Sequence, residues 1–375
     1  MSVGYEQWQD MTITDVLDGL DAVDWAALQH AYGSAEDVPR LLRALRADDA
    51  AAREKALHAL YGNIFHQGSR YEASAYAVPF LVGLAADADT RDRAAILGLI
   101  GSLTVGYDEA HLPQGLDIDG WRAEIEELRS GDREEMRRRV EEWVDEAVDD
   151  GDRRVREMRL HMFDPDGSYE YARHELAVYD AVRAHVPQLL ALLDDPDAAV
   201  RTGAVYVLAW FPEEAGLIVP RLHVLLAEEQ LPAVAACALL AVALVTDAED
   251  AETIGILRQR LRAKEPLQCW SAAVGLARLG AADADVVAIL AAAVVEPPAQ
   301  DGPGVPFQSG DLRGYTSVAL AAVDRTVAAG ALDALLAGLA GPRGLRRSRS
   351  PRRCSTSPSA PTNHGRCPHT ANSTT

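Results

Sequence analysis

The stretch VPQLLALLDDPDAAVRTGAVYVLAW, residues 186–210, has the composition of two short helices joined by an acidic step. Pro187 suits the first turn of a helix, where its missing N–H costs nothing, and the leucines after it are spaced three and four apart on one face. The aspartates at positions 194, 195 and 197 end this helix, and they can cap the next one and complement its positive end. The stretch therefore predicts an antiparallel helix pair.

The same plan recurs along the chain. Copies that open with a Val-Pro pair lie at residues 38–60, 78–97 and 219–244, and weaker copies cover 252–279 and 285–323. The prolines at positions 39 and 79 are 40 residues apart, and those at 187 and 220 are 33 apart, which is typical of two-helix repeat units. Because one such pair cannot bury its apolar face alone, we expect successive copies to stack.

At these residues the chain resembles the HEAT-repeat family, in particular the short bacterial form called PBS-lyase HEAT-like. The pattern P-x-L-L-x-x-L-x-D-x-(D)-x-x-V-R-x-x-A-x-x-A-L is matched almost completely from Pro187 to Leu208. The resemblance implies an all-α fold, a right-handed superhelical α-solenoid of antiparallel helix pairs of the armadillo type. It also implies an inter-repeat ladder of charges, with Asp195 pairing Arg201, and Asp87 or Asp89 pairing Arg93.

Charge and composition exclude several classes of protein. The 375 residues carry 36 Lys and Arg against 57 Asp and Glu, a net charge of -21, which opposes binding to nucleic acid because that binding needs clustered cations. The four cysteines provide no disulfide framework, and the first residues lack a basic segment followed by an apolar one. The longest apolar run, residues 233–245, is too short to span a membrane. We therefore expect a cytoplasmic protein.

Changes in the pattern divide the chain into five segments. We predict a helical N-terminal cap over residues 1–34, HEAT-like repeats over 35–103 and again over 185–340, and a charged helical segment over 104–184. This middle segment contains either divergent repeats or an insertion, because the repeat pattern lapses there. Residues 341–375 hold seven arginines and no acid, and we expect this basic tail to be disordered, with a composition that suggests a frameshift.

Two groups of residues are candidates for contact with a partner. The first is a long polar and aromatic connection between repeats, residues 61–72, which either contacts a partner at the rim or packs its rings over the edge of the stack. The second is an aromatic strip on the second helices, which lies either on the concave face or in the core. The predicted partner-binding residues are Tyr61, Phe65, His66, Gln67, Arg70, Tyr71, Trp210 and Trp270.

The patterns that resemble metal sites are incomplete. Asp164, Asp166, Ser168 and Glu175 have the spacing of a calcium loop, but Tyr169 stands where that loop requires glycine, so we expect an ordinary turn. His174-Glu175 is a single His-Glu pair, whereas the HEAT-like deoxyhypusine hydroxylases bind di-iron through several such pairs. We therefore predict no catalytic residue, no metal and no cofactor.

These observations favour a non-catalytic HEAT-repeat scaffold that holds another protein or peptide along its concave surface. The strongly negative charge predicts a partner with basic features, and it predicts neither nucleic acid nor membrane as a partner. The alternative is an enzyme or enzyme subunit of the bilin-lyase type, which would need an apolar groove for a tetrapyrrole. A deoxyhypusine-hydroxylase-like oxidoreductase and a HEAT-like DNA glycosylase are weaker alternatives.

Overall fold

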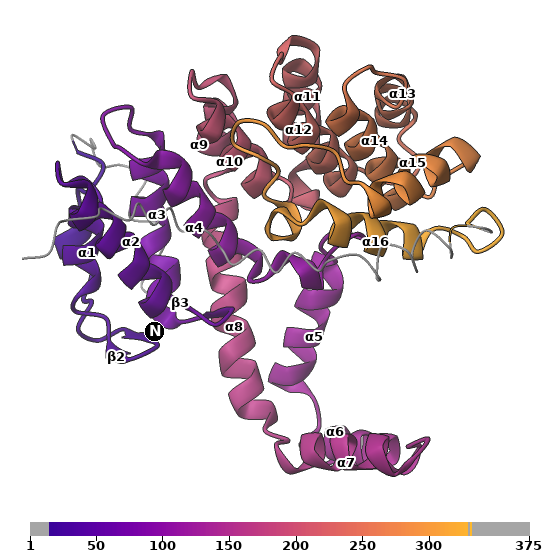
Figure 1. The fold of residues 1–375 in the computed structure, drawn as a ribbon. Helices are drawn as coiled ribbons and strands as arrows, with labels where there is room; N and C mark the ends of the chain where they lie inside the picture. The colour runs from indigo at the N-terminus through magenta and orange to yellow at the C-terminus, as the bar shows by residue number, and fades with distance from the viewer. Residues whose placement is uncertain (1–14, 329–330, 332–375) are drawn as a thin grey trace, which may run out of the picture.

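The chain folds almost entirely into helices (Figure 1). The computed structural model describes residues 15–328 and residue 331. In this part the strands are β1 (Gln29–His30), β2 (Gly33–Ser34), β3 (Phe65–His66) and β4 (Ser69–Arg70). The helices are α1 (Val38–Ala44), α2 (Ala50–Asn63), α3 (Glu72–Ala86), α4 (Arg93–Val105), α5 (Ile118–Ser130), α6 (Arg133–Asp145), α7 (Asp150–His161), α8 (Pro165–Arg183), α9 (Val186–Ala191), α10 (Ala198–Leu208), α11 (Ala215–Glu228), α12 (Pro232–Val245), α13 (Ala251–Arg260), α14 (Pro266–Arg278), α15 (Ala284–Val295) and α16 (Leu312–Ala322).

Twelve of these helices form six pairs that pack in series. The pairs are α1 with α2, α3 with α4, α9 with α10, α11 with α12, α13 with α14, and α15 with α16. The second helices contact one another in the order α4, α10, α12, α14 and α16, so that each pair buries its apolar side against the next. Helix α12, between α10 and α14, has every residue from Ala233 to Val245 buried. The chain is thus an all-α, helical repeat-like protein.

The junction between α4 and α10 joins residues that are about 100 positions apart in the sequence. A Cβ on Gly203 would lie 2.9 Å from the Cβ of Leu97, and one on Gly101 would lie 2.5 Å from the ring of Tyr206. Because the separation of two packed helices depends on the side chains at their contact, these glycines let α4 and α10 approach closely. Helix α10 therefore continues the stack directly from α4.

Arginines in the first turns of the second helices α2, α4 and α10 connect each of the first three pairs to the pair that follows it. Arg53 binds Asp92 at 2.6 Å, Arg93 binds Asp195 at 2.6 Å, and Arg201 binds Glu229 at 2.8 Å. Arg201 also donates to the carbonyl of Asp195 in its own repeat. Arg93 and Arg201 thus bind carboxylates of the following repeat in the stack.

The ladder predictions need correction in detail. Arg93 forms its ion pair with Asp195 rather than with Asp87 or Asp89, because Asp195 lies just before α10, the helix that packs on α4. Asp87 instead accepts a hydrogen bond from the Thr90 hydroxyl and lies 3.8 Å from Arg46. Arg201 reaches the main chain of Asp195, whereas its carboxylate partner is Glu229.

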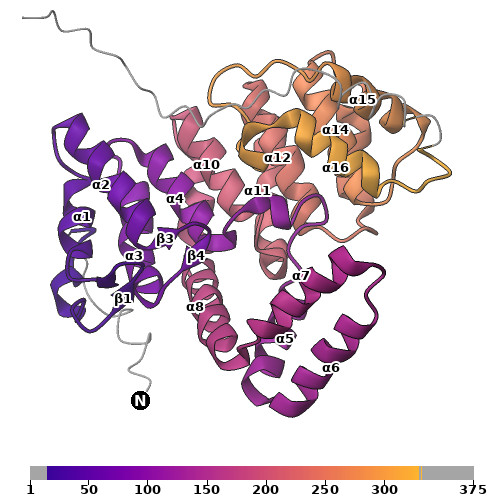
Figure 2. The ribbon, with the colours of Figure 1, turned by 60° about the horizontal axis from the view of Figure 1, so that its bottom comes forward.

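Helices α5 to α8 form an arm that projects from the stack (Figures 1 and 2). Helix α8 packs on α3 and α4 at the root, α5 packs on α8, and α6 pairs with α7 at the tip. No residue of α7 is buried, since this helix packs mainly on α6. The residues between the two blocks of repeats thus lie outside the serial packing of the second helices.

The connection after α15 folds back over the second helices. Phe307, in the 3₁₀ turn η6 (Phe307–Gly310), packs its ring on those of Tyr206, Trp210 and Tyr315. Asp108, in the 3₁₀ turn η3 (Asp108–Ala110), accepts a hydrogen bond of 2.9 Å from the N–H of Gln308. These contacts bury Trp210, just after α10, and partly cover Tyr206 of α10.

The described part of the predicted N-terminal cap, residues 15–34, differs from the helical structure that we predicted. Residues 15–34 form turns, the 3₁₀ turn η2 (Leu20–Ala22) and the two-residue pairing of β1 with β2, rather than helices. Gly19 and Gly33 have positive φ angles of 83° and 113°, which interrupt helix formation. Residues 1–14 and the predicted tail at 341–375 lie outside the described residues. Within the described part, no helix combines the length and apolar character needed to cross a membrane.

We expect Gly203→Val to destabilise the protein by about 1–3 kcal/mol, because the added side chain would overlap Leu97 at the α4–α10 junction. The matched control is Gly255→Ala in α13, where nothing lies within 4 Å of the added Cβ and where alanine should stabilise the helix by about 0.5–1 kcal/mol. Urea unfolding followed by circular dichroism measures both changes. Equal effects of the two substitutions would contradict the close junction.

The buried carboxyl of Asp108 should make stability depend on pH. Burial raises its pKa from the ordinary 3.8 to about 7, with the nearby Glu109 adding to the rise and the Gln308 N–H and Tyr206 hydroxyl opposing it. The folded chain therefore holds a proton between pH 4 and 7 that the unfolded chain releases. The free energy of unfolding therefore includes a contribution of about 4 kcal/mol from this group that is fully present below pH 4. This contribution is lost progressively as the pH rises from 4 to 7.

Asp108→Asn should remove this part of the pH dependence, because the amide keeps the acceptor for Gln308 and carries no charge. We expect the variant to be more stable than the wild type at pH 8 and to differ less from it at pH 5. Urea unfolding across this range checks the difference, and parallel stability profiles for the two proteins would contradict the assignment.

Candidate functional site

The predicted loop at residues 61–72 is a β-hairpin. Strands β3 and β4 pair antiparallel, and Gln67 and Gly68 form the two-residue turn with φ angles of 53° and 90°. Such a turn needs positive φ at both positions, which glycine adopts without strain. The ring of Tyr107 lies over Gly68, so that a Cβ at Gly68 would be 2.8 Å from it. The hairpin is therefore a fixed structure rather than an irregular connection.

The hairpin residues divide into buried and accessible ones. Phe65 and Arg70 are buried, and this corrects their prediction as partner contacts: Phe65 packs against the rings of Tyr61 and Tyr107. Gln67 is exposed, and Tyr61, His66 and Tyr71 are half-buried. The hairpin thus combines a structural side with a side that faces solvent.

Arg70 connects the hairpin to α8 by a buried ion pair. Its guanidinium lies 2.9 Å from the carboxylate of Glu175 and also donates to the carbonyl of Gly68. Burial lowers the pKa of Arg70 and raises the pKa of Glu175, and the attraction between the two charges opposes both shifts. The hydroxyl of Tyr171 donates to Ser69 at 2.9 Å. Helix α8 and the hairpin are therefore held together by two polar contacts.

This arrangement brings together three segments that were singled out separately in the sequence: the hairpin, the stretch after Asp164, and the His174-Glu175 pair. Helix α8 begins at Pro165, so residues 166–175 are helical and do not form the turn that we predicted. Asp164 caps the helix by accepting from the N–H of Gly167, and Asp166 binds Arg133 at 2.7 Å. The acidic residues of this stretch thus have structural partners.

A cleft of about 650 Å³ lies between α5 and α8 beside the hairpin. Glu124 of α5 is exposed and forms no ion pair with any described residue. Tyr171 of α8 is 43% exposed. The cleft therefore offers a free carboxylate and an accessible ring in one hollow. Its lining residues are Trp121, Glu124, Ile125, Leu128, Asp164, Gly167, Ser168, Tyr171, Ala172 and Glu175.

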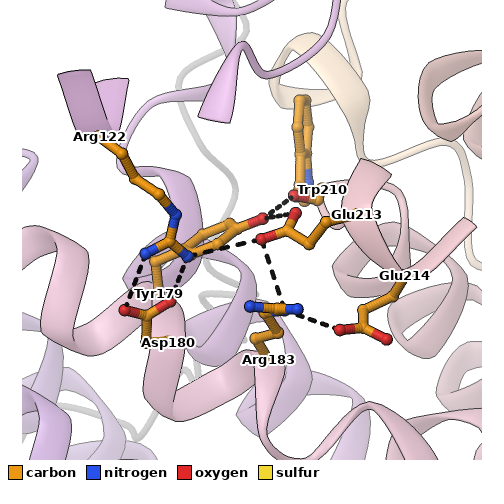
Figure 3. Close-up of polar contacts among 7 residues, drawn as sticks. All are labelled: Arg122, Tyr179, Asp180, Arg183, Trp210, Glu213 and Glu214. Carbon is orange, nitrogen blue, oxygen red and sulfur yellow. Dashed lines mark hydrogen bonds and ion pairs between the residues drawn. The ribbon is translucent and has the colours of Figure 1, made fainter. Parts of the chain in front are cut away.

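A polar network fixes the root of the arm to the stack (Figure 3). Arg122 of α5 binds Asp180 of α8 at 2.6 Å, and Arg183 of α8 binds Glu214, which follows α10, at 2.7 Å. The hydroxyl of Tyr179 donates to Glu213 at 2.5 Å, and burial raises the pKa of this tyrosine. Both walls of the cleft are thus positioned by contacts at their inner ends.

Trp210 and Trp270 are core residues, which corrects their prediction as partner contacts. Trp210 is fully buried beneath Phe307, at a ring separation of 5.9 Å. Trp270 is buried beneath α16, where its indole N–H donates to the Thr316 hydroxyl at 2.7 Å. The large apolar area of both rings is thereby removed from water, which favours packing over exposure.

Sequence reasoning missed the two residues that give the cleft its chemistry. Glu124 stands among other acids on α5, and Tyr171 is one of several aromatic residues of α8, so neither is distinctive in the sequence. The available signal was the helical spacing of Trp121, Ile125 and Leu128, which marks one face of α5. That spacing does not reveal that the facing helix is α8.

The comparisons with known proteins identify no relative. Neither a protein-family model nor a curated protein matches the sequence. Among solved structures, the chain is similar to a crystal structure described as an engineered protein from a structural genomics consortium. Identity is 17%, the match covers 81% of this chain and 92% of that chain, and the TM-score is 0.25. A likeness of this size carries no argument about fold or function.

We expect Glu175→Ala to lower the free energy of unfolding by about 3–5 kcal/mol, because it leaves the buried guanidinium of Arg70 without its partner. Chemical unfolding measures the loss. Replacing both residues, Arg70→Met with Glu175→Leu, should recover most of it, since no charge then remains buried.

The control for this ion pair is Glu170→Ala, which removes an exposed carboxylate from the same helix and should leave the unfolding midpoint almost unchanged. A similar loss of stability for Glu170→Ala and Glu175→Ala would show that the Arg70–Glu175 contact is not the cause.

Proposed function

We propose that this protein is a non-catalytic scaffold that binds a basic segment of another protein, and that the cleft between α5 and α8 is its principal contact surface. The observation that carries the proposal is the combination of the unpaired carboxylate of Glu124 with the accessible ring of Tyr171 in one hollow. A carboxylate beside an aromatic face suits arginine or lysine, which can pair with the first and stack on the second.

The charges around the cleft support a basic partner. Glu175 is neutralised by Arg70, and Asp164 is engaged as a helix cap, so Glu124 is the carboxylate left free to bind. The chain as a whole carries a charge of -21, which would steer a cationic segment toward it. The apolar side chains of Ile125 and Leu128 in the same cleft can contact the aliphatic part of that segment.

The rigid mounting of the cleft supports a role as a scaffold. Its two walls are held at the root by Arg122 and Arg183, and the hairpin is attached to α8 through Arg70. Preformed surfaces lose less conformational entropy on binding than flexible ones. The binding surface proposed here lies on the arm, whereas the aromatic anchors expected on the concave face, Trp210 and Trp270, are buried.

The proposal also concerns the arrangement of the helix pairs in space. We propose that the six helix pairs form a HEAT-like, right-handed superhelix. The serial packing of α4, α10, α12 and α14 supports this, as does the ladder of arginines that bind the following repeat. The arm is then an insertion into a repeat array, and the array serves as its rigid base.

A labelled peptide of alternating arginine and leucine residues tests the cleft. We expect it to bind the full chain with micromolar affinity by fluorescence anisotropy, and Glu124→Gln and Tyr171→Ala should each weaken binding about fivefold or more. Raising the salt concentration should weaken binding as well, because the contact is charged and exposed.

The matched control is Asp119→Asn, which removes an exposed charge from α5 outside the cleft and should leave the affinity within about twofold of the wild type. Peptide binding that responds equally to Asp119→Asn and Glu124→Gln would show general attraction to an acidic protein. That result would exclude the cleft as the site.

A further inference from the structure

Helix α11 carries a line of apolar side chains that nothing in the described chain covers. Leu217 and Val224 are 52% and 46% exposed and lie seven residues apart on this helix. Pro220 and Ala227, three residues after Leu217 and Val224, are also exposed. Apolar residues alternately three and four apart form the seam by which two helices pack together in a coiled coil. The outer face of α11 therefore has the pattern of an interface rather than of a solvated surface.

The neighbouring outer helix, α13, does not carry this line of large apolar side chains. Helix α13 also packs on the outside of its partner helix, and the residues it exposes include Glu252 and Gln259, which are seven positions apart. Polar side chains are the normal solution for the solvated face of an amphipathic helix. The apolar line on α11 is therefore not a requirement of the stack.

The charges beside the line identify what covers it. In the seven-residue notation of packed helices, Leu217 and Val224 occupy position a, Pro220 and Ala227 position d, and Arg221 and Glu228 position e. When two such helices pack antiparallel with Val224 facing Ala227 of the other copy, the e positions face each other. Arg221 of one copy then faces Glu228 of the other, and the two-fold axis repeats this ion pair.

We propose that α11 is a dimerisation surface and that its occupant is α11 of a second copy of this chain, packed antiparallel about a two-fold axis. Both charged residues are available for exchange. Glu228 is exposed and has no side-chain partner among the described residues, and Arg221 holds only an exposed pair with Asp194. The inference is independent of the cleft, because α11 and the arm expose different residues.

The size of the contact sets the expected affinity. A helix of 14 residues is about 21 Å long, so one helix pair gives a contact at the small end of specific protein interfaces. We therefore expect a dimer that dissociates in the micromolar range. Sedimentation velocity of the full chain from about 1 to about 200 µM should show a concentration-dependent shift from one copy to two.

Charge exchange tests the arrangement directly. Glu228→Arg places like charges opposite each other twice per dimer, and Arg221→Glu does the same with the opposite sign, so each should weaken dimerisation about tenfold or more. The double variant, Arg221→Glu with Glu228→Arg, restores opposite charges and should return the affinity to within about threefold of the wild type. Gln259→Arg, on α13, is the matched control and should have no effect.

Several results would overturn the proposal. One is a chain that sediments as a single copy over the whole range, as it would if another segment of the same chain covered α11. Another is a double variant that dimerises no more tightly than the single variants, which would exclude the antiparallel pairing. A third is a dimer that ignores all the α11 variants and is lost in Met158→Lys, which would place the interface on α7. Circular dichroism confirms that each variant is folded.

Discussion

The close contact between α4 and α10 is the constraint on which the other features depend. Two glycines and the Arg93–Asp195 ion pair join helices that are separated in the sequence by the whole arm. Because the repeats meet there directly, the intervening residues must leave the stack and return to it. The arm, the cleft between its walls and the position of the hairpin all follow from that one junction.

Local structure was predictable from the sequence because its causes are local. Pro187 and the leucines after it specify a helix, and the aspartates after them specify its end and the cap of the next helix, as the structure has them. The all-helical composition follows in the same way. Residues 15–34 of the predicted N-terminal cap are not α-helical, because Gly19 and Gly33 adopt positive φ angles, which the apolar spacing around them does not reveal. Apolar periodicity thus located the helices more reliably than it located their interruptions.

Long-range partners were not predictable because they depend on which segments meet. Arg93 pairs with an aspartate about 100 residues away rather than with the nearby Asp87 or Asp89. Trp210 is buried because the distant Phe307 folds over it, and Arg70 is buried because α8 supplies Glu175. Each residue had a plausible role in isolation. The structure changes that role by adding a neighbour from another part of the chain, and so the cleft became visible only with α5 and α8 side by side.

The arm also has an evolutionary consequence. Its helices α6 and α7 pack mainly on each other, and the chain enters and leaves the arm at one junction of the stack. Insertions, deletions or wholesale replacement at the tip therefore leave the register of the repeats intact. Among proteins that descend from a common ancestor, we therefore expect the sequence of the tip to change faster than the sequence of the repeats.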